Sequence, residues 1–225
     1  MYYNQIIKHL HKENIIGKGK EITAYKVKNQ VIKEFHKNRL SPLKLINQEG
    51  LKKLTTLDLK CFNNPKELIY DKDIIVGYTE DYIKDDYLNI EFLKDNLDLL
   101  YEDIITLSNN GFIINDIQYN YLSNDNTFKF IDMTSYEYID IDKIKSNTGK
   151  KFILDKINKD NIRTINTFLI GFFEYNAYRK GEHFELTKTN KAVMFNNKYC
   201  HDKFYGEHLK QKKKTRKLIS WRTNI

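Results

Sequence analysis

The sequence predicts an α+β fold with two lobes, in which an antiparallel sheet in residues 1–83 is followed by a mainly helical part in residues 84–225. Two observations support this prediction. Short runs rich in β-branched and aromatic residues, separated by tight turns, dominate the first part. Apolar residues at helical spacing dominate the second part. A chain of 225 residues is long enough for one sizeable core or two small lobes.

The first elements expected are a short helix in residues 1–14 and three strands. Gly17 and Gly19 punctuate the first turn between strands, and Asn29 with Gln30 forms the second. The three strands are expected in residues 15–16, 25–27 and 31–35.

A helix and two more strands complete the first lobe. Ser41 is a good N-cap residue and Pro42 suits the first helical position, so a helix is expected in residues 41–57. The segment 66–83 then indicates two strands joined by a tight turn at residues 71–73.

The second lobe is expected to contain helices and one hairpin. A helix in residues 89–109 is ended by Asn110 and Gly111, a common C-terminal signal. The later elements are a hairpin with strands 121–123 and 127–131, and an apolar helix in residues 160–178.

Composition and charge limit the classes of function. Hydrophobic residues make up 40% of the chain, which is typical of a globular protein. No apolar run approaches the ~20 residues that span a bilayer, and no signal peptide is evident. Cys61 and Cys200 are far apart, which favours a reducing, cytoplasmic location over a disulfide framework or zinc site.

The net charge of +8 is concentrated in a basic C-terminal tail that includes the run KQKKKTRK at residues 210–217. Such a tail can make weak contact with nucleic acid or an anionic surface. We favour a solvated terminus, because no nucleic-acid-binding motif accompanies the lysines.

A first group of candidate site residues lies in the expected sheet. Gly17, Lys18 and Gly19 follow an apolar strand, where a glycine turn lets the backbone approach a phosphate closely. Lys33 lies between apolar strand neighbours and could neutralise phosphate charge, and Glu49 on the next helix could pair with it. An ordinary hairpin turn, a solvent-facing lysine and a surface glutamate are the alternatives.

A second group surrounds the expected hairpin. Asp116 and Asn120 precede the hairpin and Asp132 follows it. Because the two ends of a hairpin are adjacent in space, the three side chains should converge. Asn120 and Asp132 offer oxygen ligands suited to Mg²⁺, which leaves Asp116 to accept a proton. The alternative is that the two aspartates are a helix cap and a turn residue.

The order of these features resembles the protein-kinase-like superfamily, which includes divergent Ser/Thr protein kinases and aminoglycoside-phosphotransferase-like small kinases. The resemblance covers residues 12–180. The matching segments are GKGKEITAYKV for the glycine-rich loop, VIK for the third-strand lysine, GYTEDYI for the strand entering the hinge, NDIQYN for the catalytic loop and FIDMTSY for Asp-Phe-Gly.

This resemblance implies a role for each candidate residue. Lys33, steadied by Glu49, would bind the α- and β-phosphates of ATP, while Asp132 and Asn120 would hold Mg²⁺ and Asp116 would act as the base.

The remaining candidates would surround the nucleotide. The loop of Gly17, Lys18 and Gly19 would cover the phosphates, and Glu80 and Tyr82 would lie near the adenine.

The chain also departs from the family pattern. The histidine of His-Arg-Asp and the glycine of Asp-Phe-Gly are absent. The family places four residues between base and asparagine, whereas three separate Asp116 from Asn120. An alignment without gaps puts Asn115 in the base position, and an amide cannot take a proton. We prefer Asp116 in a shorter loop; the other alignment predicts a pseudokinase.

The expected function is therefore ATP- and Mg²⁺-dependent transfer of a phosphoryl group to a hydroxyl, on Ser/Thr of a protein or on a small molecule. The alternatives are an inactive pseudokinase that serves as a nucleotide-binding or regulatory module, and a nucleic-acid-binding protein acting through the basic tail.

Overall fold

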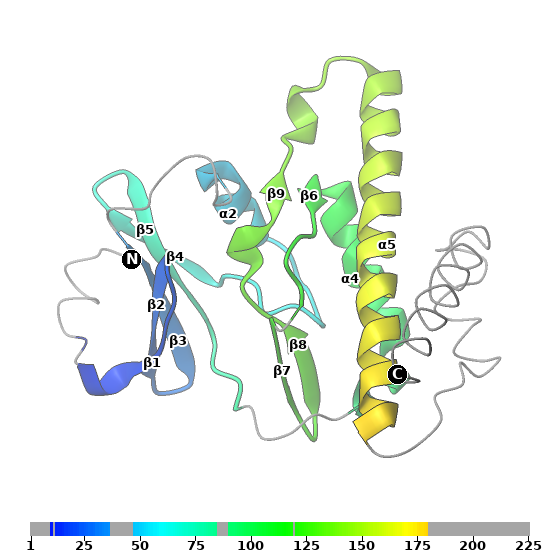
Figure 1. Ribbon diagram of the computed structural model, residues 1–225. Coiled ribbons are helices and arrows are strands. Elements are labelled where there is room, and N and C mark those ends of the chain that lie inside the picture. Colours follow the sequence, from blue (N-terminus) through cyan, green and yellow to red (C-terminus); the bar gives the residue numbers. More distant parts are fainter. Residues whose placement is uncertain (1–9, 11, 37–46, 85–89, 119, 180–225) are drawn as a thin grey trace, which may run out of the picture. The chain divides into compact units, whose positions relative to one another are not determined.

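The computed structural model describes residues 10, 12–36, 47–84, 90–118 and 120–179 (Figure 1). The chain divides into two compact units, Met1–Thr164 and Ile165–Ile225. All the site residues discussed below belong to the first unit. The expected lobe boundary between residues 83 and 84 remains a prediction, and the basic tail lies outside the described residues.

The structure combines an antiparallel sheet with a helical part, as the sequence predicts. The strands are β1 (Ile15–Lys18), β2 (Ile22–Val27), β3 (Gln30–Phe35), β4 (Glu67–Asp71), β5 (Ile74–Asp81), β6 (Phe112–Ile113), β7 (Tyr121–Asn124), β8 (Thr127–Phe130) and β9 (Glu137–Tyr138). The helices are α2 (Gln48–Leu54), α3 (Ile90–Asp95), α4 (Leu97–Asn109) and α5 (Asn147–Arg179). No helix in the described part of the chain is long and apolar enough to cross a membrane.

The five expected strands of the first lobe form one antiparallel sheet in the order β1-β2-β3-β5-β4. Lys28 and Lys72 adopt positive φ angles in the two tight hairpin turns, β2–β3 and β4–β5. In the register of the sheet, Lys33 on β3 lies opposite Ala24 on β2 and Tyr78 on β5. This register places Lys33 in the middle strand of the sheet, where it is flanked on both sides.

The two faces of the sheet differ in character. On one face, Ile32, Ile69 and Val76 form a buried apolar cluster. Side chains alternate between faces along a strand, so Lys33 lies on the other face with Tyr78 and Glu80. The sheet therefore buries two charged side chains on one face and aliphatic residues on the other.

The helices begin and end where local signals place them. Asn47 caps α2, because its side chain accepts a hydrogen bond from the backbone N–H of Gly50 at 2.8 Å. The expected start of this helix at Ser41 lies outside the described residues. Asn96 separates α3 from α4, which the sequence predicted as one helix. Gly111 ends α4 at φ 82°, as predicted, because its left-handed conformation suits glycine.

The second part of the chain contains the predicted hairpin, formed by β7 and β8 around a two-residue turn. A small sheet of β6 and β9 was not predicted. The apolar helix expected in residues 160–178 is the C-terminal portion of α5, which begins at Asn147 and is 33 residues long. Its first part is polar, which is why apolar spacing alone missed it.

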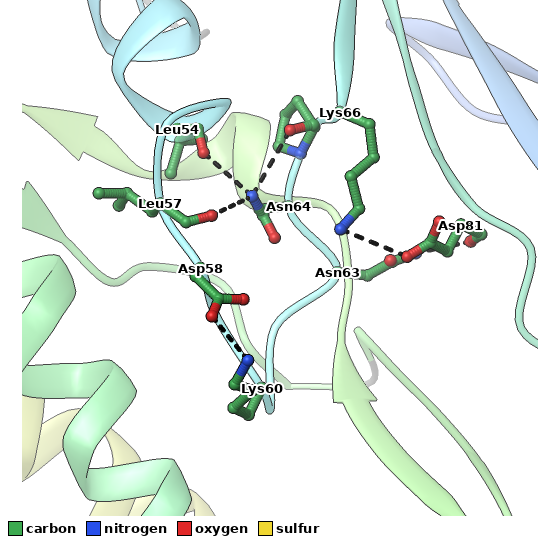
Figure 2. Close-up of polar contacts among 9 residues, drawn as sticks. Leu54, Leu57, Asp58, Lys60, Asn63, Asn64, Lys66 and Asp81 are labelled. Atoms are coloured by element: carbon green, nitrogen blue, oxygen red, sulfur yellow. Dashed lines mark hydrogen bonds and ion pairs between the residues drawn. The ribbon is translucent and has the colours of Figure 1, made fainter.

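Residues 61–65, between α2 and β4, are buried and link the sheet to the hairpin. The backbone N–H of Asn63 donates to the Phe130 carbonyl at 2.8 Å, and the Asn63 side chain donates to the Asp81 carbonyl at 2.9 Å. Figure 2 shows Asn64 directed at the carbonyls of Leu54 and Leu57. Asn63 thus connects the end of β5 with the end of β8.

The same segment is anchored to α4 by a buried carboxylate. Asp103 Oδ2 accepts hydrogen bonds from the backbone N–H groups of Lys60 at 2.8 Å and Cys61 at 2.6 Å. Burial raises the pKa of Asp103 to about 6, although these two hydrogen bonds and nearby lysines oppose the rise. Asp103 therefore holds the segment that is hydrogen-bonded to Phe130 at the end of β8.

Candidate functional site

The central feature of the site is a buried ion pair on the sheet. Lys33 Nζ lies 3.1 Å from Glu80 Oε1, and the two side chains are only 10% and 5% exposed. The Lys33 ammonium also lies 5.6 Å from the centre of the Tyr78 ring. The burial of Lys33 on β3 excludes the alternative of a solvent-facing lysine, while its contact with phosphate stays a prediction.

Electrostatics connect this ion pair to the hairpin. Burial alone would lower the pKa of Lys33, but the negative charges that Tyr78, Glu80 and Asp132 can carry outweigh it and raise the pKa. Burial raises the pKa of Glu80, against the opposing effect of Lys33. Asp132 acts on both members of the pair, so the end of β8 lies within electrostatic reach of Lys33.

The expected pairing of Lys33 with Glu49 is wrong in this structure. Glu49 lies in the first turn of α2 with its side chain 61% exposed, and it pairs with Lys52 at 3.0 Å. Glu80, which we expected near adenine, takes its place. Strand alternation could have shown this, because Glu80 lies two residues beyond Tyr78 and so on the same face.

Asp116, Asn120 and Asp132 are brought together at the base of the hairpin. The backbone N–H of Ile131 donates to the Asn120 carbonyl at 2.9 Å, which places Asn120 beside the residue that precedes Asp132. The Asn120 side chain donates from Nδ2 to the Asp116 carbonyl at 2.6 Å. The prediction that the hairpin ends converge therefore holds for the backbone.

A second connection ties the two loops together. The Ser135 hydroxyl donates to the Asp132 carbonyl at 3.1 Å and to the Asn115 carbonyl at 3.4 Å. Asn115, the base position in the gap-free alignment, donates from its side chain to Glu137 Oε1 at 3.2 Å. Hydrogen bonds thus connect the loop that holds Asp116 with the loop that holds Asp132.

Both aspartates have left-handed backbone conformations. Asp116 has φ 49°, and Asp132 has φ 62°. Of the non-glycine residues described with positive φ, only these two lie outside the tight hairpin turns of the sheet. Such conformations cost about 1–3 kcal/mol each and tend to occur at functional sites. The strain agrees with a site at this position.

A buried tyrosine lies near both carboxylates. Burial raises the pKa of Tyr136, and the charges of Asp132 and Asp116 raise it further. Its hydroxyl is buried and has no hydrogen-bond partner among the described residues. Tyr136 could not be predicted as part of the site, because a single tyrosine beside a loop carries no periodic signal.

The donor set at the base of the hairpin fits Mg²⁺. Asp132 Oδ1 already accepts a hydrogen bond from the Thr134 hydroxyl at 2.9 Å, an arrangement that fixes the carboxylate. Carboxylate and amide oxygens are ligands that Mg²⁺ accepts, usually together with substrate phosphates. Within the described residues, no three His, Cys, Asp or Glu side chains could hold a metal by themselves. A cation here would need further oxygens from water or phosphate.

Of the predicted glycine turn, only Gly19 lies between β1 and β2, because β1 extends through Gly17 and Lys18, which pair with Ala24 and Thr23 on β2. Gly17, Lys18 and Gly19 are exposed, and the backbone N–H of Gly19 donates to the Ile22 carbonyl at 2.9 Å. A Cβ atom at Gly17 or Gly19 would meet no heavy atom closer than 3.6 Å. The packing of the chain therefore does not require glycine at either position.

Tyr82, also expected near adenine, follows the end of β5. Its backbone N–H donates to the Asn29 carbonyl at 3.0 Å, and Lys26 Nζ lies 3.7 Å from the centre of its ring. Lys26, Val31 and Glu80 are consecutive across β2, β3 and β5 in the sheet register. Tyr82 is therefore positioned beside the face of the sheet that carries Lys33.

A buried asparagine supports the loop from α5. Asn161 accepts a hydrogen bond from the Ile114 N–H at 2.8 Å and donates to the Phe112 carbonyl at 2.7 Å and the Ser108 hydroxyl at 2.9 Å. These bonds fix the segment just before Asp116. No sequence pattern distinguishes Asn161 from the other residues of so asparagine-rich a chain.

Comparisons with known proteins give little independent information. No protein-family signature and no curated protein sequence matches the chain. Among solved structures, the chain is similar to the Legionella pneumophila Lpg2603 kinase bound to IP6, with 13% identity and a TM-score of 0.44. The alignment covers 81% of this chain and 79% of that protein.

Proposed function

We propose that this protein is a divergent kinase that transfers the γ-phosphoryl group of Mg-ATP to a hydroxyl. The observation that carries the proposal is the buried Lys33 on β3, which lies within electrostatic reach of Asp132. A buried ammonium within electrostatic reach of the Asp132 carboxylate suits a ligand that brings both phosphate and Mg²⁺.

Each residue has a defined task in this proposal. Lys33 would neutralise phosphate charge from the sheet, and the exposed backbone of the β1–β2 turn would cover the phosphates. Asp132 and Asn120 would hold Mg²⁺, which stabilises the negative charge that develops during transfer. Asp116 would orient the acceptor hydroxyl and take its proton. Catalysis would then come from positioning and charge stabilisation.

The acceptor is proposed to be Ser or Thr of a protein, with a small-molecule hydroxyl as the second choice. Asp116 is exposed, so an acceptor carried by another molecule could reach it. The face of the sheet at Tyr82 and Lys26 is the proposed location of the adenine, because Lys26 and Glu80 belong to one row across the sheet, on the face that carries Lys33.

Incubation of the purified full chain with γ-labelled ATP and Mg²⁺ tests this function. We expect autophosphorylation, transfer to a generic protein acceptor, or slow ATP turnover. Asp132→Asn and Asp116→Asn should each abolish the signal. Asp73→Asn, in the exposed β4–β5 turn, is the matched control and should retain it.

An inactive nucleotide-binding module is the second candidate. The observation that favours it is the short loop, in which Asn115 stands at the base position of the alternative alignment and is bonded to Glu137. This candidate predicts ATP binding without transfer, and full biological activity in Asp116→Asn. Transfer that depends on Asp116 would exclude it.

A further inference from the structure

We propose that Glu80 is the positioning residue for Lys33, so that the sheet alone assembles the phosphate-binding lysine and helix α2 has no part in switching the site. The inference rests on the proposed function for its nucleotide measurements, but not for its measurement of Lys33 itself. It assigns the counter-ion to a strand, whereas the sequence and the family resemblance assigned it to the helix.

The pairing of β3 with β5 holds Lys33 close to Glu80. Lys33 and Glu80 lie on β3 and β5, which are hydrogen-bonded neighbours, and Val31 directly faces Glu80 in the register. The strands pack closely at this point, because a Cβ atom added to Gly77 would collide with the Lys33 carbonyl. Separating the pair would therefore require the sheet to open.

The side chains of Lys33 and Glu80 are both buried. Both side chains are removed from water, and a buried ammonium without a counter-ion is strongly disfavoured. Glu80 uses Oε1 for Lys33, while Oε2 is buried and has no hydrogen-bond partner among the described residues. Glu80 is thus committed to Lys33, and its second oxygen is left to accept from a bound ligand or water.

Helix α2 does not supply the counter-ion of Lys33. Glu49, its only acidic residue, is exposed and paired with Lys52 in the same helix. For Glu49 to hold Lys33, it would have to leave water and displace a carboxylate that is already in contact. A movement of α2 would therefore leave the Lys33–Glu80 pair intact.

Within the described part of the chain, the charged and titratable groups that act on Lys33 can be named. Tyr78 and Glu80 come from β5, Asp132 follows β8, and the residue opposite on β2 is the uncharged Ala24. The charges that act on Glu80 are those of Lys33, Asp132 and Asp81. Removal of Glu80 should leave Asp132 as the main remaining negative charge on Lys33.

The test compares Glu80→Gln with Glu49→Gln in the full chain. NMR of protein with labelled lysine side chains, with the Lys33 signal identified by its loss in Lys33→Met, reports the protonation of Lys33 without nucleotide. We expect Lys33 to titrate at clearly lower pH in Glu80→Gln and to be unchanged in Glu49→Gln. Unchanged titration in Glu80→Gln would overturn the proposal.

Nucleotide binding provides the second measurement. The apparent affinity for Mg-ATP, obtained from thermal shifts, should be at least tenfold weaker in Glu80→Gln than in wild type, and it should weaken further as pH rises. In Glu49→Gln the apparent affinity should equal the wild-type value. Equal losses in both variants would show that α2 takes part and would refute the inference. If wild type shows no nucleotide shift while the Lys33 titration still depends on Glu80, the positioning role stands and the proposed function fails.

Glu80→Gln leaves Lys33 buried without a counter-ion and could fail to fold. Glu80→Asp keeps the charge on a side chain one methylene shorter, so it should fold and give intermediate values in both measurements. Wild-type behaviour of Glu80→Asp in nucleotide binding, together with normal Lys33 titration, would contradict a positioning role that depends on side-chain reach.

Discussion

Asn161 Oδ1 accepts a hydrogen bond from the backbone N–H of Ile114 at 2.8 Å, across 47 residues of sequence. The same side chain donates to Phe112 and Ser108, so one buried amide makes three bonds in the core of the first unit. The segment that it fixes runs directly into Asp116. The position of the proposed base therefore depends on a helix residue that never touches the site.

Asn161→Ala should destabilise the protein by about 2–4 kcal/mol, because it leaves a buried N–H and a buried carbonyl without partners. Chemical denaturation measures this loss. Asn158→Ala is the matched control, one turn earlier on α5. Its Oδ1 has no partner among the described residues, so the change should cost far less. Equal losses in the two variants would show that the Asn161 hydrogen bonds contribute little.

Gly17→Ala and Gly19→Ala should leave the free energy of unfolding within about 1 kcal/mol of wild type, since both sites have room for a Cβ atom. Both should weaken Mg-ATP binding if the turn approaches phosphates. Gly77→Ala is the contrasting control and should destabilise the sheet, because the new Cβ would meet the Lys33 carbonyl. Unaltered nucleotide affinity in both turn variants would remove the phosphate-covering role of the turn.

Asp103 should make the stability of the protein depend on pH. Its pKa is raised from 3.8 to about 6 in the folded state, so the folded protein keeps a proton that the unfolded chain releases. The stabilising contribution is present below pH 3.8 and is lost as pH rises through 6.

Asp103→Asn keeps an acceptor oxygen for both backbone N–H groups but cannot ionise. The stability of this variant relative to wild type should therefore rise by about 3 kcal/mol between acidic and slightly alkaline pH. Urea unfolding at the two pH values measures the difference. A constant difference would mean that Asp103 ionises in the folded protein as readily as in the unfolded chain.

Tyr136→Phe should not destabilise the protein, because the hydroxyl that it removes has no hydrogen-bond partner among the described residues. The free energy of unfolding should be unchanged or up to about 1 kcal/mol higher. Mg²⁺-dependent nucleotide binding should weaken, since both Asp116 and Asp132 act on this hydroxyl. Tyr138→Phe, two residues further along, should change neither property. A clear loss of stability in Tyr136→Phe would reveal a partner for the hydroxyl.

The sequence was most informative where local chemistry decides structure. Tight turns located β3, β4 and β5, and Gly111 located the end of α4, because these signals act within a few residues. The proximity of the Asp116 and Asp132 loops could also be predicted, because the two ends of a hairpin are always adjacent in space. These parts of the fold and site could be predicted without knowledge of distant contacts.

The remaining features depend on tertiary contacts that local patterns do not encode. The partner of Lys33 depends on strand register, and Glu80 was one of many acidic residues until that register was known. The role of Asn161 depends on how α5 lies against β6, over a separation of 47 residues. The start of α5 could not be predicted from apolar spacing, because the first half of this helix is polar.

Thermal unfolding with ATP, in the presence and absence of Mg²⁺, tests the claim that Lys33 and Asp132 form a Mg-ATP site. Ligand at about 100 times its dissociation constant should add ~2.7 kcal/mol of stability. We predict that Mg-ATP stabilises wild type more than ATP alone, and that Asp132→Asn loses the Mg²⁺-dependent part while Asp73→Asn retains it. No stabilisation of wild type at millimolar Mg-ATP would contradict the claim.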